Sequence, residues 1–244
     1  MKKETKDYLC LALDLDDKQE ILAIVRELKD LVGYFKLNYT YTKYGPDIIK
    51  DIKNLGGKVF LDLKFHDIPN TIEGYARTAT ALNIDIFNVH ASGGKEMMAA
   101  AVKGAKEEAK KNNIEKPLIL AVTILTSIDQ EIMNNEINMQ GDIDSQVLNL
   151  AKISKESGMD GIVCSAADLE KIKKELPENF FFLTPGIKGA TIGSDQKRIY
   201  TPKKAISEGS SLLVLGRGIL KASNRREEAR KVLQLIEEGL KNKN

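Results

Sequence analysis

The feature that most constrains the fold is an eightfold alternation of short apolar runs with longer amphipathic stretches. The apolar runs, which predict strands, lie at 8–14, 33–38, 58–64, 85–90, 118–125, 161–165, 180–185 and 211–216. The stretches with apolar residues at helical spacing lie at 17–31, 46–55, 70–82, 94–112, 145–157, 167–176, 201–208 and 225–241. Near-continuous apolar strands are typical of parallel sheets, which are buried on both faces. The alternation predicts a single (β/α)8 TIM barrel domain over residues 1–244, with a doubly wound open sheet as the alternative.

The charge balance and the length of the apolar runs argue against two classes of partner. With 37 Lys and Arg against 35 Asp and Glu, and no basic stripe with interleaved aromatic residues, we expect no nucleic-acid partner. The longest apolar runs have the length of strands, so we expect no membrane span. The first residues, MKKETKDY, turn polar after two lysines and do not resemble a signal peptide, so we expect a cytoplasmic protein.

The two cysteines and the two histidines do not predict a metal site. Cys10 and Cys164 each lie in an apolar run, which favours buried thiols over a redox pair. His66 and Asp67 are possible metal ligands, but no second carboxylate–histidine pair at suitable spacing accompanies them. We therefore expect no metal site.

Polar residues gather where the predicted strands end. The set comprises Asp14, Lys36, Asn38, Asp62, Lys64, His90, Thr123, Thr126, Ser165, Thr184, Pro185, Gly216 and Arg217. In a barrel of parallel strands these positions converge on the C-terminal mouth, where such enzymes keep their active sites. This convergence, more than any single residue, predicts an enzyme.

The densest group of charges is DLKFHDI at 62–68, which follows the apolar run KVFL. Side chains alternate along a strand, so Asp62 and Lys64 should point the same way, about 6.5–7 Å apart along the backbone. Lys36 on the preceding strand should join them, while Asp67 falls in the following loop. Such alternating Lys and Asp side chains stabilise one another's charged forms. A salt-bridged edge strand is the alternative, and the apolar flank argues against it.

Two glycine-containing loops predict a site for a phosphate group. LGRGIL at 215–220 follows the eighth strand, where backbone N–H groups and the Arg217 guanidinium can bind an anion. The loop TPGIKGATIGSDQKR at 184–198 is long enough to act as a lid, with Lys188 or Gln196 closing over the phosphate. The alternatives are a tight turn with a surface arginine and a merely mobile loop.

Taken together, these motifs resemble one known family. FLDLKFHDIPNT, with ALD at 12–14, FK at 35–36, VTILTS at 122–127, TPGI at 184–187, SDQKR at 194–198 and VLGRGI at 214–219, resembles orotidine 5'-phosphate decarboxylase of bacterial type. The resemblance runs in order from residue 8 to about 220. It implies a homodimeric (β/α)8 barrel that converts orotidine 5'-phosphate, a small-molecule substrate, to UMP and CO2 without a cofactor. That reaction is the last step of de novo UMP biosynthesis.

The resemblance also implies a catalytic tetrad. Lys64 is expected to donate a proton to C6 of the pyrimidine, in a group completed by Lys36, Asp62 and Asp67. In this family the second aspartate reaches the active site from the other subunit. Asp67 is therefore expected to serve the partner's site, so that the two active sites are shared across the dimer.

The remaining carried-over positions are expected to bind substrate. Asp14 and Lys36 would contact the ribose, Thr71 would lie at the dimer-facing side of the pocket, and Asp62 would lie beside the substrate carboxylate. The base and phosphate contacts are expected from Thr126 with Ser127, Gln196, Gly216, Arg217 and Lys188.

The chain departs from the family at two positions and leaves two other functions open. Lys188 stands where the family commonly has arginine, and a lysine offers a point charge without the guanidinium fork. FKLN replaces the more usual Lys-Val-Gly after the second strand. The alternatives are a related sugar-phosphate barrel enzyme of the 3-hexulose-6-phosphate synthase or ribulose-phosphate epimerase type, which requires a divalent metal, and a non-catalytic barrel that binds a phosphate ligand.

Overall fold

The computed structural model describes residues 3–188 and 200–242, and its sheet is a closed barrel. Eight strands follow one another around the barrel in chain order, each parallel to its neighbours, and β8 pairs with β1. The strands are β1 (Leu9–Ala12), β2 (Tyr34–Leu37), β3 (Val59–Phe65), β4 (Ile86–His90), β5 (Leu118–Val122), β6 (Gly161–Val163), β7 (Phe181–Thr184) and β8 (Leu212–Leu215). The predicted (β/α)8 architecture is confirmed, and the open sheet is excluded.

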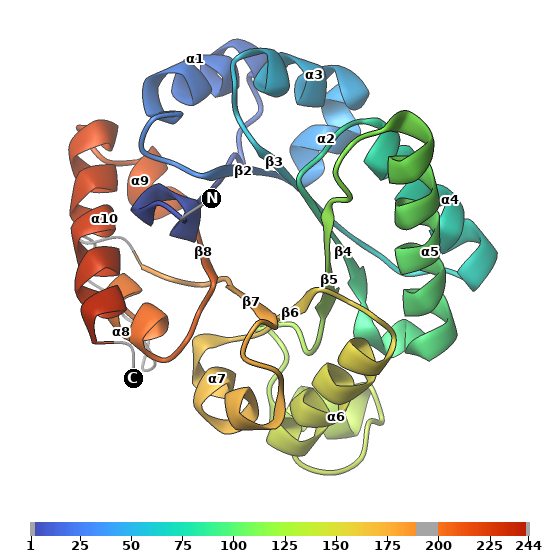
Figure 1. Ribbon diagram of the computed structural model, residues 1–244. Coiled ribbons are helices and arrows are strands. Elements are labelled where there is room, and N and C mark those ends of the chain that lie inside the picture. The colour runs from blue at the N-terminus through green and yellow to red at the C-terminus, as the bar shows by residue number, and fades with distance from the viewer. Residues whose placement is uncertain (1–2, 189–199, 243–244) are drawn as a thin grey trace.

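Helices form a ring around the outside of this barrel (Figure 1). The α-helices are α1 (Lys18–Leu28), α2 (Tyr39–Tyr44), α3 (Pro46–Asn54), α4 (Pro69–Ala81), α5 (Gly94–Asn112), α6 (Ile143–Glu156), α7 (Ala166–Ile172), α8 (Pro202–Ser207), α9 (Arg217–Leu220) and α10 (Arg225–Lys241). Shorter turns of other helix types are η1 (Thr5–Tyr8), η2 (Ala91–Gly93), the π-helical η3 (Ile132–Glu136) and η4 (Lys173–Glu175). All eight predicted helical stretches are confirmed, with small shifts at their ends.

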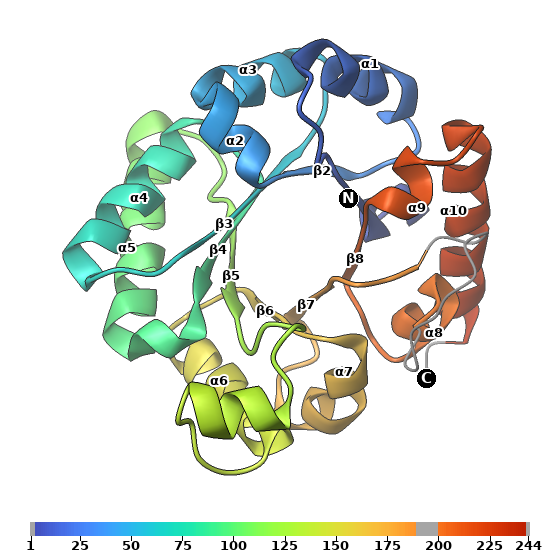
Figure 2. The same cartoon turned by 180° about the vertical axis from the view of Figure 1, so that it is seen from behind.

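The two short helices α2 and α9 were not expected from the sequence. Each immediately follows a strand, and each is too short to show an amphipathic period of its own. Figure 2, which turns the molecule by half a revolution, shows α9 lying between β8 and α10. These helices place residues that follow β2 and β8 along the rim of the barrel.

Helix starts are set by residues that are suited to them. The Asp17 side chain accepts a hydrogen bond from the backbone N–H of Glu20 at the start of α1, and Asn224 accepts one from Glu227 at the start of α10. Proline occupies the first turn of α3, α4 and α8, where its missing N–H costs no helical hydrogen bond. These capping residues and prolines therefore fix the positions at which α1, α3, α4, α8 and α10 begin.

Two separate hydrophobic cores support the barrel. The inner one fills the barrel with side chains from Cys10, Ala12, Phe60, Ile86, Leu120, Val122, Val163, Leu183, Leu212 and Val214. The larger outer one lies between the strands and the helices and includes Cys164. Both thiols are free and buried, as predicted, and burial raises the pKa of each. Across the described residues, no helix combines the length and the apolar character needed to cross a membrane.

Candidate active site

A cavity of about 290 Å³ opens at the C-terminal mouth of the barrel. Its lining comes from β2, β3, β5, β6, β7 and β8 and from the residues that follow them, namely Lys36, Asn38, Phe60, Asp62, Lys64, Val122, Ile124, Leu125, Thr126, Val163, Cys164, Leu183, Pro185 and Val214. One wall carries the charges and the rest is largely apolar. The predicted convergence is confirmed for Lys36, Asn38, Asp62, Lys64, Thr126 and Pro185, which all line this cavity.

The charged wall is a chain of ion pairs in which the signs alternate. Lys36 Nζ lies 3.4 Å from Asp14 Oδ1 and 3.2 Å from Asp62 Oδ2, and Lys64 Nζ lies 2.7 Å from Asp62 Oδ1. Lys36 and Asp62 are buried, each with 8% of its surface exposed. A buried charge without a partner is costly, so the alternation is what allows these groups to be placed here.

The array holds Lys36 and Asp62 in their charged forms. Burial alone would raise the pKa of Asp62, but the ammonium groups of Lys36 and Lys64 and the hydrogen bonds from Lys64 and Asn88 outweigh it and lower the pKa. For Lys36, burial would lower the pKa, but the carboxylates of Asp62 and Asp14 raise it above its ordinary value. At neutral pH Lys36 is therefore an ammonium group and Asp62 a carboxylate.

Asp62 and Lys64 meet as predicted, but β3 does not have the regular alternation on which that prediction was based. Leu61 pairs with Phe87 and Phe65 pairs with Val89, so three residues of β3 lie opposite the single residue Asn88 of β4. Lys64 has a φ of 49°, in the left-handed region that a residue with a Cβ seldom adopts. A β-bulge, rather than the pleat, turns the Lys64 side chain back to Asp62.

Asn88 is a site residue that the sequence analysis missed. Its side chain is fully buried, with Nδ2 donating to Asp62 Oδ1 at 2.7 Å and Oδ1 accepting from the Lys64 backbone N–H at 2.8 Å. The available signal was a single amide inside the otherwise apolar run IFNV at 86–89. Asn38 acts from the other side, donating to the Asp62 backbone carbonyl at 3.0 Å.

Asp67 and Thr71 lie away from the array within this chain. Asp67 is exposed in the loop between β3 and α4, where its Oδ1 accepts from the Ile68 N–H at 2.7 Å. Among residues 3–188 and 200–242, no ion pair links Asp67 to Lys64. Thr71 lies in the first turn of α4. Both are close in sequence to Ile68, which is 66% exposed and among the most exposed large apolar residues of the described chain.

The predicted phosphate corner follows β7 and β8, next to β1 in the barrel. Gly216 caps the N-terminus of α9, and Arg217 begins that helix with its side chain exposed. Lys188 follows Gly186, whose φ of 75° turns the chain after β7. Within the described part of the chain, neither cation makes an ion pair. Gln196 and the rest of residues 189–198, which belong to the predicted lid loop at 184–198, lie outside the described residues.

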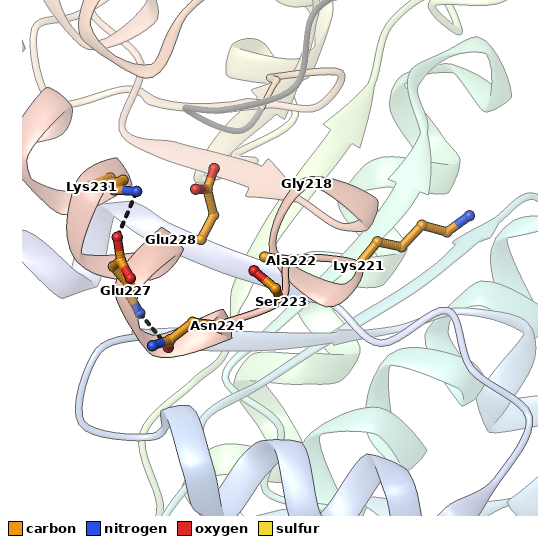
Figure 3. Close-up of a pocket in the computed structure, with 8 residues that line it drawn as sticks. All are labelled: Gly218, Lys221, Ala222, Ser223, Asn224, Glu227, Glu228 and Lys231. Carbon is orange, nitrogen blue, oxygen red and sulfur yellow. Dashed lines mark hydrogen bonds and ion pairs between the residues drawn. The ribbon is translucent and has the colours of Figure 1, made fainter.

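A second cavity of about 220 Å³ lies beside α9 and the start of α10, lined by Gly218, Lys221, Ala222, Ser223, Asn224, Glu227, Glu228 and Lys231 (Figure 3). Lys231 pairs with Glu227 at 2.8 Å, while the Lys221 side chain points away from α10. This cavity shares no lining residue with the one at the mouth. In the described ranges, no three His, Cys, Asp or Glu side chains cluster in a way that would hold a metal ion.

Comparison with known proteins agrees with this geometry. The family model for the orotidine 5'-phosphate decarboxylase / HUMPS family matches residues 7–232. A relative in Carboxydothermus hydrogenoformans, named orotidine 5'-phosphate decarboxylase, is 46% identical over 233 residues, covering 95% of this chain and 96% of its own. A relative of the same name in Syntrophomonas wolfei is 43% identical over 238 residues, covering 96% of this chain and 100% of its own.

A solved structure gives the same answer in three dimensions. The crystal structure of orotidine 5'-phosphate decarboxylase from Lactobacillus acidophilus superimposes with a TM-score of 0.83 at 36% identity, covering 93% of this chain and 98% of its own. Sequence and structure thus agree over nearly the whole length. The chain belongs to the orotidine 5'-phosphate decarboxylase / HUMPS family.

Proposed function

We propose that this protein decarboxylates orotidine 5'-phosphate to UMP and CO2, without a cofactor, in the last step of de novo UMP biosynthesis. The observation that carries the proposal is the Lys36–Asp62–Lys64 array, already ion-paired at one wall of an otherwise apolar cavity. Relatives covered almost end to end bear the name of this activity, which supports the same assignment.

The chemistry requires a cation at one atom. When the bond between C6 and the carboxylate carbon breaks, CO2 leaves and the bonding electron pair remains on C6. No adjacent group of the pyrimidine takes up that pair, so the protein must stabilise it electrostatically. The Lys64 ammonium, held 2.7 Å from Asp62 Oδ1, supplies a positive charge and then the proton that completes UMP.

Asp62 and the apolar lining strengthen this effect. Asp62 fixes both ammonium groups and stays ionised, because its pKa is lowered. Its charge disfavours a second carboxylate beside it, which is relieved once CO2 has left. Val122, Ile124 and Val163 line the cavity, and a poorly hydrated site makes each charge interaction stronger than in water.

The remaining contacts follow from the positions of the side chains. Asp14 and Lys36 would bind the ribose hydroxyls, and Thr126, with Ser127 next to it, would bind the pyrimidine at the mouth of the cavity. Arg217, Gly216 and Lys188, together with Gln196, would bind the phosphate. Arg217 and Lys188 make no ion pair with another described residue, so no described carboxylate competes with a phosphate for them.

The direct test follows the absorbance of orotidine 5'-phosphate after mixing with purified protein in excess chelator. We expect complete conversion to UMP, with CO2 released in equal amount. Activity that required a divalent metal would indicate an enediolate-forming enzyme of the same architecture. An unchanged spectrum with tight nucleotide binding would indicate a barrel that only binds its ligand.

The enzyme is proposed to act as a homodimer with shared sites, as a single-domain protein of the cytoplasm. Tyr39, Ile68 and Tyr75 are 43%, 66% and 43% exposed, which is unusual for large apolar side chains. Tyr39 begins α2, whereas Ile68 precedes α4 and Tyr75 lies within it, both near Asp67 and Thr71 in sequence. A second copy covering this face would bury them and would bring Asp67 towards its partner's array.

Complementation tests this sharing. Lys64→Ala and Asp67→Ala homodimers should each be inactive, because every site lacks one member of the tetrad. After random subunit exchange in an equal mixture, activity should return to about a quarter of the wild-type level, since half the dimers are mixed and each has one intact site. If mixed dimers are demonstrated and remain inactive, Asp67 does not act across the interface.

A further inference from the structure

Asn88 joins the two catalytic side chains of β3 through one buried amide. Its Nδ2 lies 2.7 Å from Asp62 Oδ1, and its Oδ1 lies 2.8 Å from the backbone nitrogen of Lys64. The Lys64 N–H can only donate and the Asp62 carboxylate only accept, so a single orientation of the amide satisfies both contacts. Because none of the Asn88 surface is exposed, water cannot substitute for either partner.

These two contacts fall at the irregular point of the sheet. The bulge sets residues 62–64 opposite Asn88 alone, so the ladder between β3 and β4 is interrupted there. The side-chain oxygen of Asn88 accepts a hydrogen bond from the backbone N–H of Lys64 at this interruption. Lys64 has a φ of 49°, a backbone conformation that costs free energy and needs stabilising contacts from its surroundings.

We propose that Asn88 is the positioning residue of the active site: its amide holds the bulge, and thereby fixes the Lys64 side chain and the Asp62 carboxylate in their mutual geometry. The inference rests on the proposed decarboxylation, since it assigns Asn88 a part in that site. Asn88 itself does not line the cavity, so it acts through Lys64 and Asp62 rather than on the substrate.

The proposal distinguishes two substitutions of Asn88. Asn88→Leu has a similar size and loses both hydrogen bonds. Asn88→Asp retains an acceptor for the Lys64 N–H but brings a second carboxyl group against Asp62. When that group carries a proton, its O–H donates to Asp62 and its other oxygen accepts from Lys64, as the amide does. When it is ionised, two carboxylates face each other, which raises the pKa of the pair.

The first measurement is steady-state turnover with a matched control. Asn88→Leu is expected to lower kcat about 100-fold, the order expected when reacting groups are misplaced by about 1 Å, and to change KM much less. Thr80→Val serves as the control, because Thr80 is also fully buried and loses a hydrogen bond of 2.8 Å to the Ala76 carbonyl in α4, remote from the mouth. Its kcat should equal that of the wild type.

The second measurement is the ratio of the Asn88→Asp kcat to the wild-type kcat between pH 8 and pH 5. The charged and titratable groups near this position are Asp62 and Lys64 on β3, Lys36 on β2, Asp14 after β1, and His90 with His66. Those groups are present in both proteins, so the ratio isolates the introduced carboxyl group. The ratio should rise as the pH falls, whereas the ratio for Asn88→Leu should stay flat.

Amide hydrogen exchange supplies a readout that does not need turnover. The Lys64 N–H should exchange faster in Asn88→Leu than in the wild type, and at the wild-type rate in Thr80→Val. If wild-type protein does not decarboxylate orotidine 5'-phosphate, the proposed function fails, but this exchange difference still tests the geometry. With an active wild type, an Asn88→Leu variant keeping more than about a third of kcat, or a flat Asn88→Asp ratio, overturns the positioning role.

Discussion

The cations on the two sides of the barrel mouth differ in whether they are ion-paired. On the side of β1 to β4, the cations Lys36 and Lys64 are ion-paired through Asp62 and Asp14, and the central carboxylate is buried. On the side of β7 and β8, Lys188 and Arg217 lie near the rim with no ion pair among the described residues, and Arg217 is exposed. Burial accounts for the pairing of Lys36 with Asp62, which are buried and costly without a partner, whereas the exposed Arg217 needs none.

This difference separates two kinds of contribution to an enzyme. Groups fixed in advance by one another act on charge that develops during the reaction, and their loss lowers kcat. Cations at a rim act mainly on a ligand group that is charged throughout, and their loss raises KM. The two sides should therefore respond to substitution with different kinetic signatures.

The largest expected effect is that of Lys64→Ala. It removes the positive charge at C6, and kcat should fall by several orders of magnitude while UMP still binds. Lys53→Ala is a matched control. Lys53, in α3, pairs at 2.8 Å with Asp85, which directly precedes β4, and neither residue lines the cavity at the mouth. A Lys64→Ala enzyme that keeps more than about a tenth of kcat, which corresponds to only about 1.4 kcal/mol of barrier, would erase the distinction between the two sides.

Arg217→Ala comes next. It should raise KM strongly, by about 100-fold if a charge-assisted contact of about 2–3 kcal/mol is lost, and lower kcat less. Phosphite added to a truncated substrate without its phosphate should activate the wild type more than this variant. Lys221→Ala, one turn further along and outside the lining of the cavity at the mouth, should respond like the wild type. Equal phosphite activation in Arg217→Ala and wild type would place the phosphate elsewhere.

The same contrast explains how far the sequence could predict this molecule. Hydrophobic periodicity located the eight strands because each is a run of side chains that must be buried, as in VFL before Asp62. It also located the strand ends, and so the convergence of Lys36, Asp62 and Thr126. Periodicity carries no information on α9, whose four residues complete a single turn.

The bulge at Lys64 could not be predicted for a different reason. Its left-handed backbone depends on Asn88, which lies 24 residues further along the chain and meets Lys64 only after β3 and β4 have paired. Regular alternation along β3 correctly predicted that Lys64 meets Asp62, but the two side chains meet through a bulge and not through the regular pleat. Hydrophobic periodicity could not predict that Asp67 lies away from the array. The expected role of Asp67 came from the family resemblance.

Lys188 should show a smaller effect than Arg217, and it sharpens the account of the rim. Lys188→Arg replaces a point charge with a forked donor that matches a phosphate, and KM should fall by up to about tenfold, or about 1.4 kcal/mol. Lys188→Ala should raise KM with kcat nearly unchanged. A large loss of kcat in Lys188→Ala would instead align this residue with the preorganised side of the mouth.

The smallest expected effect is the dependence of stability on pH that His90 introduces at the end of β4. Burial lowers the pKa of His90, repulsion from His66 and Lys64 lowers it further, and Asp62 opposes the shift. Above the unfolded-state value of about 6.5, His90 is neutral in both states and has no effect. As the pH falls from there through the folded-state pKa, the unfolded chain takes up the proton first, so the folded state loses stability.

The chain has only two histidines, and both lie on the β3 and β4 side, with ring centroids 5.4 Å apart. The urea midpoint should therefore stay constant from pH 7.5 to about pH 6.5 and decline from there to about pH 5.2, above the range where most carboxylates titrate. His90→Asn should flatten that decline, and His66→Asn should flatten it less, because it removes only one source of repulsion on His90. If the urea midpoint of His90→Asn declines as steeply as that of the wild type, another group causes the loss of stability in acid, and His90 on the charged side of the mouth does not.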